Sequence, residues 1–191
     1  MRSWPVLIAL VAGACGGIPS RASSTFEASD EGWTISGNGE ATKPVLEKEG
    51  GNPGAAICGQ DAVEGDVWYF RAPEKYLGDA SGSYGKRLTF DLRQDEFLYQ
   101  LSGRDVIVQG GGLAVTINLP LRPPKQWYPY SFVLSIADAW TRDDLSGHGP
   151  PATEEELRTV LRDINSIQIR GEFYDGPLDR ACLDNVYFGR D

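Results

Sequence analysis

Apolar and polar residues alternate at a period of two along several short segments of the chain. The clearest segment is Leu113–Leu119, in which every second residue is Leu, Val or Ile, and residues 88–92 and 130–136 follow the same rule. Such a period places successive side chains on opposite faces of a half-buried strand. Strands are predicted at Trp33–Ser36, Ala55–Cys58, Asp66–Arg71, Arg87–Arg93, Asp105–Gln109, Leu113–Leu119, Tyr130–Ile136, Ser166–Tyr174 and Leu183–Phe188.

A helical period occurs once, near residues 153–164. Thr153 and Glu156 have the spacing of a capping box, and apolar residues follow Leu157 at i+3, i+4 and i+7. The Gly110–Gly112 run joins two predicted strands and indicates a hairpin turn, because it lacks the Lys-Ser/Thr pair of a phosphate-binding loop. The pattern predicts a mainly β domain with one short helix.

The N-terminus has the features of an export signal. A basic start is followed by the apolar run Trp4–Val11 and by small residues before Cys15. A cysteine in this place resembles a bacterial lipobox, whose thiol receives lipid, but Ala12 stands where Leu is usual, so ordinary signal cleavage is the alternative. We expect a signal peptide at 1–14, a flexible tether at 15–24 and one folded domain at 25–191.

Composition narrows the classes of function. The 191 residues carry a formal net charge of −9, which disfavours nucleic acid because binding to phosphates depends on Lys and Arg. Nothing in the sequence predicts a nucleotide site. His148 is the single histidine and lies in a Gly/Pro-rich segment, which argues against histidine-based catalysis. A glycosidase that uses two carboxylates remains an alternative.

The three cysteines are odd in number for an exported protein. If Cys15 carries lipid, Cys58 and Cys182 remain, either as one disulfide in an oxidising compartment or as two buried thiols.

The motifs DVWYFRAP, YLGD and SYG in residues 66–85, IRGEFY at 169–174 and LDNVYF at 183–188 resemble the laminin B domain, also called laminin IV type A. The resemblance covers nearly all of the predicted exported domain. It implies an antiparallel jelly-roll β-sandwich of the galactose-binding-like kind, similar to carbohydrate-binding modules. With three cysteines the chain cannot build the EGF-like modules of animal relatives, so it resembles stand-alone bacterial members.

The wider resemblance to galactose-binding-like sandwiches also implies a structural Ca²⁺ where the first and last strands meet. By matching positions, Glu27 and Asp184 are the candidate side-chain ligands, and the Asn52 region offers carbonyl oxygen. The alternative is a solvated Glu27 and an Asp184 that only begins a strand. The same convergence would place Cys58 and Cys182 on adjacent strands, which favours the disulfide.

The predicted function is therefore a non-catalytic, calcium-stabilised binding or adhesion domain outside the cytoplasm, tethered to a bacterial envelope through Cys15. The ligand class is a glycan or a surface protein. Trp127 and Tyr128 are the best aromatic contacts in a loop, although both are also typical of a packed rim. A carbohydrate-active hydrolase, a purely structural envelope lipoprotein and a secreted protein are the alternatives.

Overall fold

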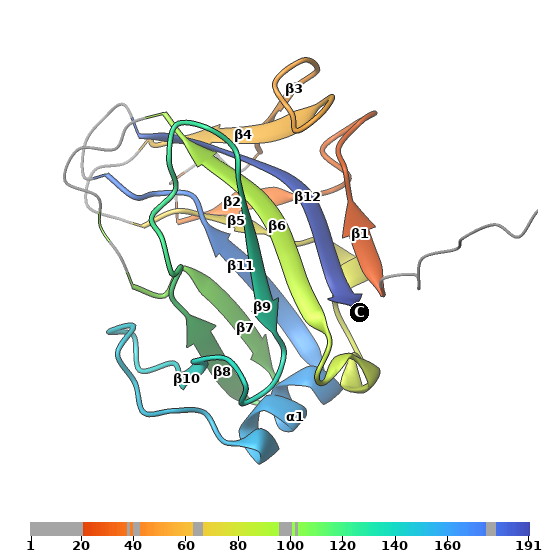
Figure 1. Ribbon diagram of the computed structural model, residues 1–191, viewed down its shortest axis with the longest axis vertical. Helices are drawn as coiled ribbons and strands as arrows, with labels where there is room; N and C mark the ends of the chain where they lie inside the picture. Colours follow the sequence, from red (N-terminus) through yellow and green to blue (C-terminus); the bar gives the residue numbers. More distant parts are fainter. Residues whose placement is uncertain are drawn as a thin grey trace, which may run out of the picture.

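Two antiparallel sheets pack face to face in the computed structural model, which describes residues 21–37, 39, 43–62, 67–95, 101, 103–174 and 179–191 (Figure 1). Sheet A has the order β3-β4-β12-β6-β9, with β1 also paired to β12. Its strands are β1 (Ala22–Ser24), β3 (Val45–Glu47), β4 (Ala56–Gln60), β6 (Arg87–Gln94), β9 (Tyr128–Val133) and β12 (Arg180–Arg190). Sheet B, in the order β10-β8-β7-β11-β5-β2, contains β2 (Thr34–Ser36), β5 (Tyr69–Arg71), β7 (Val106–Gly110), β8 (Leu113–Ile117), β10 (Thr141–Arg142) and β11 (Ile164–Arg170). The predicted β-sandwich with one α-helix is confirmed.

Large aromatic side chains fill the space between the sheets. Trp68 and Phe70, two residues apart at the start of β5, are fully buried, and their ring centroids lie 5.1 Å apart. From sheet A, Phe90 stacks on Tyr130 at 5.4 Å. Because each strand of sheet A turns every second residue inward, its intervening residues face outward, and these outward residues form the candidate site.

The helix α1 (Glu154–Arg162) closes one end of the sandwich. Its capping box is formed, since the backbone N–H of Glu156 donates to Thr153 Oγ1 at 3.2 Å and the N–H of Thr153 donates to Glu156 Oε2 at 2.9 Å. Leu157, Val160 and Leu161 are buried against the strands. The described residues also form two short 3₁₀ helices, η1 (Glu74–Tyr76) and η2 (Ser81–Ser83).

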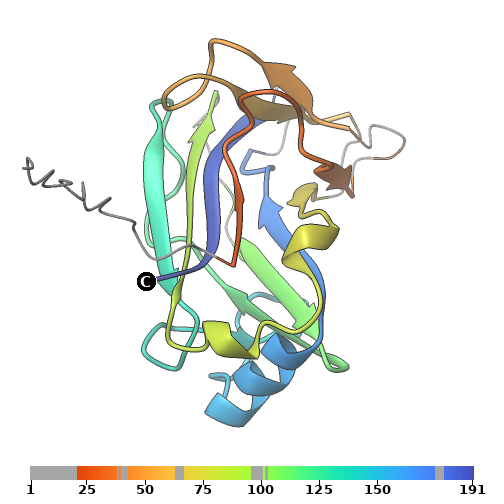
Figure 2. The ribbon, with the colours of Figure 1, turned by 90° about the vertical axis from the view of Figure 1, so that its right-hand side faces the viewer.

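The last strand, β12, is central to sheet A. On one side it pairs with β6, and on the other it pairs with β4 through its first half and with β1 through its second half (Figure 2). A bulge interrupts its pairing with β6 between Asp184 and Tyr187, where Asn185 has φ 50°. A second irregularity follows between Phe188 and Arg190. Residues from both ends of the chain therefore meet on this strand.

The structure corrects two predicted boundaries. Ala22–Ser24 forms β1 against β12, so these three residues belong to the sandwich and not to a tether. Ile136 is 58% exposed and not on a buried face, because β9 ends at Val133. The predicted signal at 1–14 and Cys15 lie outside the described residues. In the described part of the chain, no helix has the length and apolar character needed to cross a membrane.

Candidate functional site

Two aspartates face each other across β6 and β12 on the outer face of sheet A. Asp91 and Asp184 are directly opposed in the antiparallel register. Asp184 is nevertheless completely buried, because the Gly50–Gly54 loop covers it. The backbone N–H of Asn52 in this loop donates to Asp184 Oδ2 at 2.6 Å. Like charges directly opposite one another destabilise a sheet, so this pair requires compensation.

Asn185, the residue in the β12 bulge, ties the loop to both aspartates. Its backbone N–H donates to Asp184 Oδ1 at 2.7 Å, and its side-chain amide donates to the carbonyl of Asn52 at 2.6 Å and to Asp91 Oδ2 at 2.8 Å. The left-handed backbone at φ 50° turns this side chain toward the loop. Asparagine adopts that conformation more readily than most residues.

Glu27 reaches the same loop from the N-terminal side. Gly54 has φ 84°, a backbone conformation that favours glycine, and a Cβ added there would lie 2.5 and 2.6 Å from the two carboxylate oxygens of Glu27, so this side chain lies directly against the loop. The preceding residue, Phe26, has φ 58°, and its N–H donates to Glu31 Oε1 at 2.8 Å. This turn directs the chain from β1 past the loop.

We name the group formed by Glu27, Asn52, Asp91, Asp184 and Asn185 the acidic cradle. Burial, together with the nearby carboxylates of Asp91 and Glu27, raises the pKa of Asp184 to about 6, although the two N–H donors lower it. The cradle offers three carboxylates and the Asn52 carbonyl, which is the all-oxygen donor chemistry that Ca²⁺ prefers. A bound cation would therefore neutralise the carboxylates of the acidic cradle.

The cradle carboxylates surround the loop without converging on one point. Within the described ranges, the single group of three acidic, histidine or cysteine residues whose ligand atoms all lie within 4.8 Å of one another is Glu47 with Cys58 and Cys182. Those two sulfurs are bonded to each other, so that group is no metal site. Two observations support calcium as the ion for the cradle. Its donor atoms are oxygens, and it contains Glu27, Asn52 and Asp184, the ligands predicted from the sequence.

The disulfide between Cys58 and Cys182 joins directly opposed residues of β4 and β12, with the two Cα atoms 4.1 Å apart. It closes a sequence separation of 124 residues. The predicted bridge is therefore formed. Cys182 lies two residues before Asp184 on the same outer face, so the bridge fixes the strand that carries the cradle.

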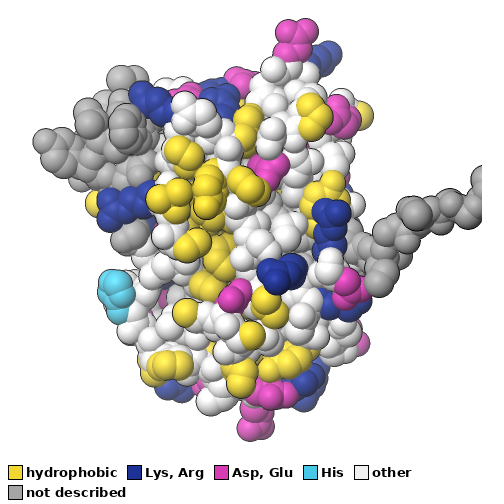
Figure 3. All heavy atoms as spheres, viewed as in Figure 1, with side chains coloured by type: hydrophobic (Ala, Val, Ile, Leu, Met, Phe, Trp, Pro, Cys, Tyr) yellow, Lys and Arg dark blue, Asp and Glu magenta, His cyan; other side chains and the backbone are white. Residues whose placement is uncertain are grey.

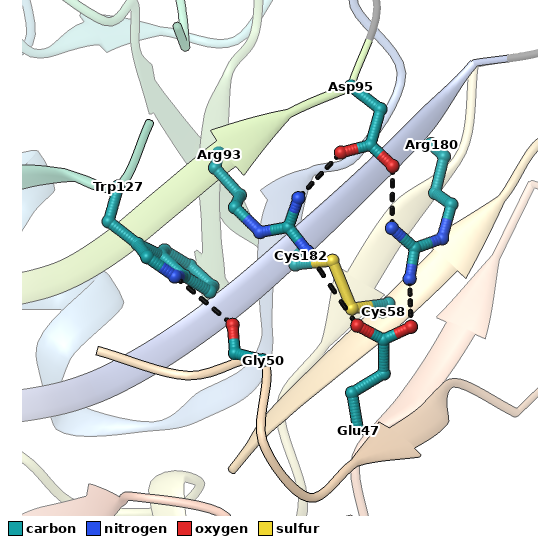
Figure 4. Close-up of a disulfide and its surroundings, with 8 residues drawn as sticks. All are labelled: Glu47, Gly50, Cys58, Arg93, Asp95, Trp127, Arg180 and Cys182. Atoms are coloured by element: carbon teal, nitrogen blue, oxygen red, sulfur yellow. Dashed lines mark hydrogen bonds and ion pairs between the residues drawn. A yellow bond between two sulfur atoms is a disulfide. The ribbon is translucent and has the colours of Figure 1, made fainter. Parts of the chain in front are cut away.

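Charged side chains surround the disulfide (Figure 4). Arg180 contacts both Glu47 and Asp95, and its distance to Asp95 is 2.6 Å. Arg93 also reaches both carboxylates, at 2.6 Å from Asp95 and 3.6 Å from Glu47. Several partly buried ion pairs that share partners form a network, which stabilises more than isolated surface pairs do.

The two predicted aromatic contacts do not form one platform. Trp127 lies on the outer face, where its Nε1 donates to the carbonyl of Gly50 at 3.1 Å and the Arg93 guanidinium is 5.4 Å from its ring centroid. Tyr128 packs instead on Tyr130, with centroids 5.0 Å apart. Consecutive residues of an extended chain point to opposite sides, which explains the separation.

A hollow of about 390 Å³ opens on the outer face beside the cradle. Its lining includes Thr89, Asp91, Ser131, Asn185, Tyr187 and Arg190, which come from β6, β9 and β12. Figure 3 looks onto this face of the sandwich, where acidic and basic side chains are interspersed with uncharged surface. Asp91 and Asn185 thus belong both to the cradle and to the hollow. The strand pattern was sufficient to place Asp91 outward, but nothing in the sequence predicted the hollow.

The sequence matches the family described as Laminin B (Domain IV) over residues 69–189. It is 30% identical to human laminin subunit gamma-2 over 164 residues, which are 84% of this chain and 13% of that protein. The horse laminin subunit gamma-2 is 34% identical over 125 residues, 64% of this chain and 10% of that protein. The L4b domain of human laminin alpha-2 has a similar fold, with TM-score 0.65, 16% identity and coverage of 91% of this chain and 98% of that domain. The chain therefore spans about a tenth of the length of the gamma subunits that it matches.

Proposed function

Because the chain belongs to the laminin B (domain IV) family, we propose that it is a non-catalytic binding domain that works outside the cytoplasm. Its ligand, a glycan or a surface protein, binds on the outer face of sheet A. The observation that carries this proposal is the hollow of about 390 Å³ over β6, β9 and β12. Its volume lies in the range of about 300 to 1,000 Å³ that is typical of small-molecule sites.

The lining of the hollow supports binding over hydrolysis. Among the described residues that line it, Asp91 is the single carboxylate. Its Oδ2 accepts hydrogen bonds from the side-chain amides of Asn52 and Asn185. A glycosidase requires two carboxyl groups that flank the scissile bond. The hollow therefore offers contacts for a sugar or a peptide without a pair of acids to cleave it.

Calcium stabilises the domain in this proposal. Glu27 and Asp184 would hold the ion with the carbonyl of Asn52, and the ion would offset the repulsion between Asp184 and Asp91. The support is the burial of Asp184, the direct opposition of Asp91 and Asp184, and the resulting rise in the pKa of Asp184. The same contacts hold the Gly50–Gly54 loop against β12, so the ion would also fix one side of the hollow.

Export and anchoring complete the proposal. A formed disulfide fits an oxidising compartment outside the cytoplasm. The lipid would be attached at Cys15. Metabolic labelling with a radioactive fatty acid tests the anchor, with Cys15→Ala as the comparison. Label in the parent protein and none in the variant is expected, whereas an unlabelled parent protein would leave secretion as the route.

Titration of the purified protein on a glycan array, with and without Ca²⁺, tests the binding function. Trp127→Ala is expected to weaken binding because Trp127 lies on the same outer face as the hollow. Tyr128→Ala is compared with it, because Tyr128 packs on Tyr130, which lines the hollow. Surface-protein extracts provide the second ligand class. Turnover of any polysaccharide would overturn the non-catalytic assignment, and failure to bind any glycan or surface protein would overturn the binding function itself.

A further inference from the structure

Two arginines face each other at the other end of the same strand pair. Arg87 on β6 and Arg190 on β12 are directly opposed in the antiparallel register. Both are exposed, and within the described part of the chain neither forms an ion pair with a carboxylate. Arg87 Nη1 donates to Ser131 Oγ at 2.9 Å, and the Arg190 guanidinium lies 4.7 Å from the ring centroid of Tyr187. The sheet thus carries two directly opposed positive charges, and among the described residues neither has an ion-pair partner.

Arg190 lines the hollow, and Arg87 lies next to it, in contact with the lining residue Ser131. Arg190, Tyr187 and Ser131 all line it, so the guanidinium of Arg190 lies at one side of the hollow and Asp91 at the other. Thr89 lies opposite Tyr187 in the strand register, between these two charges. The hollow therefore has a basic end, a middle that includes the hydroxyl groups of Thr89 and Ser131 and the ring of Tyr187, and an acidic end.

We propose that the hollow binds an acidic saccharide, with a sugar carboxylate held by Arg190 and Arg87. This proposal rests on the binding function proposed above and names its ligand class. The guanidinium fork matches the two oxygens of a carboxylate, and such charge-assisted hydrogen bonds are stronger than neutral ones. Thr89 and Ser131 present hydroxyl groups that suit the sugar hydroxyls. Repulsion from Asp91 orients the carboxylate toward the arginines.

The charge of the whole chain limits the form of this ligand. A net charge of −9 repels long polyanions, so the local pair of arginines favours a short acidic oligosaccharide or the acidic end of a glycan. A neutral sugar would leave the two opposed guanidinium groups without a counter-charge. The carboxylate would relieve a repulsion that the free domain carries.

The test is calorimetric titration of the purified protein with a tetrasaccharide that contains glucuronic acid and with its carboxyl-reduced form. We expect the acidic form to bind roughly tenfold to a hundredfold more tightly, which is the effect of a charge-assisted hydrogen bond. Arg190→Gln and Arg87→Gln should each remove most of that preference. Arg162→Gln on α1 removes an equal charge from an exposed residue outside the hollow and should keep it.

The outcomes separate this proposal from the general binding function. Equal affinity for the acidic and reduced forms, or no change in Arg190→Gln, would overturn the acidic-saccharide assignment while a binding domain remained. No affinity for either form would overturn it as well. Failure of the glycan array and of the surface-protein extracts together would overturn the binding function. Thermal melting of each variant, compared with the parent protein, shows that the fold is intact.

Discussion

The strand pair of β6 and β12 carries a like-charge pair in each half of its outer face, which we call the acidic end and the basic end, and the two differ in what covers them. At the acidic end, the Gly50–Gly54 loop covers Asp184, which is fully buried, and its Asn52 side chain donates to the half-buried Asp91. At the basic end, Arg87 and Arg190 are exposed to solvent. Like charges thus oppose each other at both ends, but a loop covers the acidic end and solvent surrounds the basic end.

This difference indicates that the two like-charge pairs have different roles, one in stability and one in binding. The acidic end is surrounded by elements that hold structure, namely the disulfide, the ion-pair network around it and the loop. A cation there would act on stability. The basic end has a hollow and no cover, so an anion there would act on binding. Changes at the acidic end should therefore alter the free energy of unfolding, whereas changes at the basic end should alter affinity.

The largest expected effect is at the disulfide. Replacing Cys58 and Cys182 together by Ala should lower the free energy of unfolding by about 3 to 5 kcal/mol, because the bridge closes a long loop and restricts the unfolded chain. Urea unfolding without reductant measures it. Reduction of the parent protein is the control and should give a similar midpoint. A loss below about 1 kcal/mol would mean that the disulfide contributes little to the free energy of unfolding and does not hold the acidic end in place.

The next effect is a pH dependence in calcium-free buffer. Because burial raises the pKa of Asp184 to about 6 in the folded state, that state holds the proton more tightly than the unfolded chain does. The resulting stability is complete below about pH 4 and is lost as pH rises through about 6, on the order of 3 kcal/mol in total. Urea midpoints across this interval measure it.

Asp184→Asn separates this contribution from that of a second buried acid. Asp179 is fully buried, and burial raises its pKa to about 7, so it adds a loss of stability of the same sign at slightly higher pH. The variant should lose the part of the pH dependence centred near pH 6 and keep the part near pH 7. An unchanged profile in the variant would contradict the pKa shift of Asp184.

Calcium should reverse the penalty at the acidic end. At a concentration about one hundred times its Kd, the ion should add about 2.7 kcal/mol, which for a domain of this size raises the melting temperature by about 5 to 10 °C. EDTA should remove the increase. Asp184→Asn should abolish the response, while Glu155→Gln, an exposed carboxylate on α1, should keep it. A full response in Asp184→Asn would place the ion elsewhere.

Much of the fold could be predicted because most of its strands and its helix are indicated by residue patterns within each segment. Strand signals located every strand of five or more residues, with a clear period of two in the sequences of β6, β8 and β9, and the capping box of Thr153 and Glu156 located the helix. Strands β1, β3 and β10 have two or three residues, too few to show a period, and they were missed. The equally short β2 and β5 were found because they lie within longer predicted segments. Their formation depends on the edge of a neighbouring strand, which a local pattern does not contain.

The candidate site was predictable only in part, for a similar reason. Asn52 and Asp184 were proposed from motifs and are in direct contact. Asp91 and Asn185 were not proposed, because their convergence depends on the β12 bulge. The opposition of Arg87 and Arg190 depends on strand register, which the sequence does not display. By contrast, the separation of Trp127 from Tyr128 follows from strand alternation alone and was open to prediction.

The smallest expected effect on stability is at the basic end, and it has the opposite sign. Arg190→Gln should raise the free energy of unfolding by a few tenths of a kcal/mol, because it removes one of two directly opposed positive charges. Arg87→Gln should do the same, and the double variant should gain no more than either single one. The gain should shrink at high salt, which screens exposed charges. Urea unfolding at two ionic strengths measures it. A loss above about 1 kcal/mol would show that the arginines hold the sheet together, and the contrast between an enclosed structural end and an open binding end would then fail.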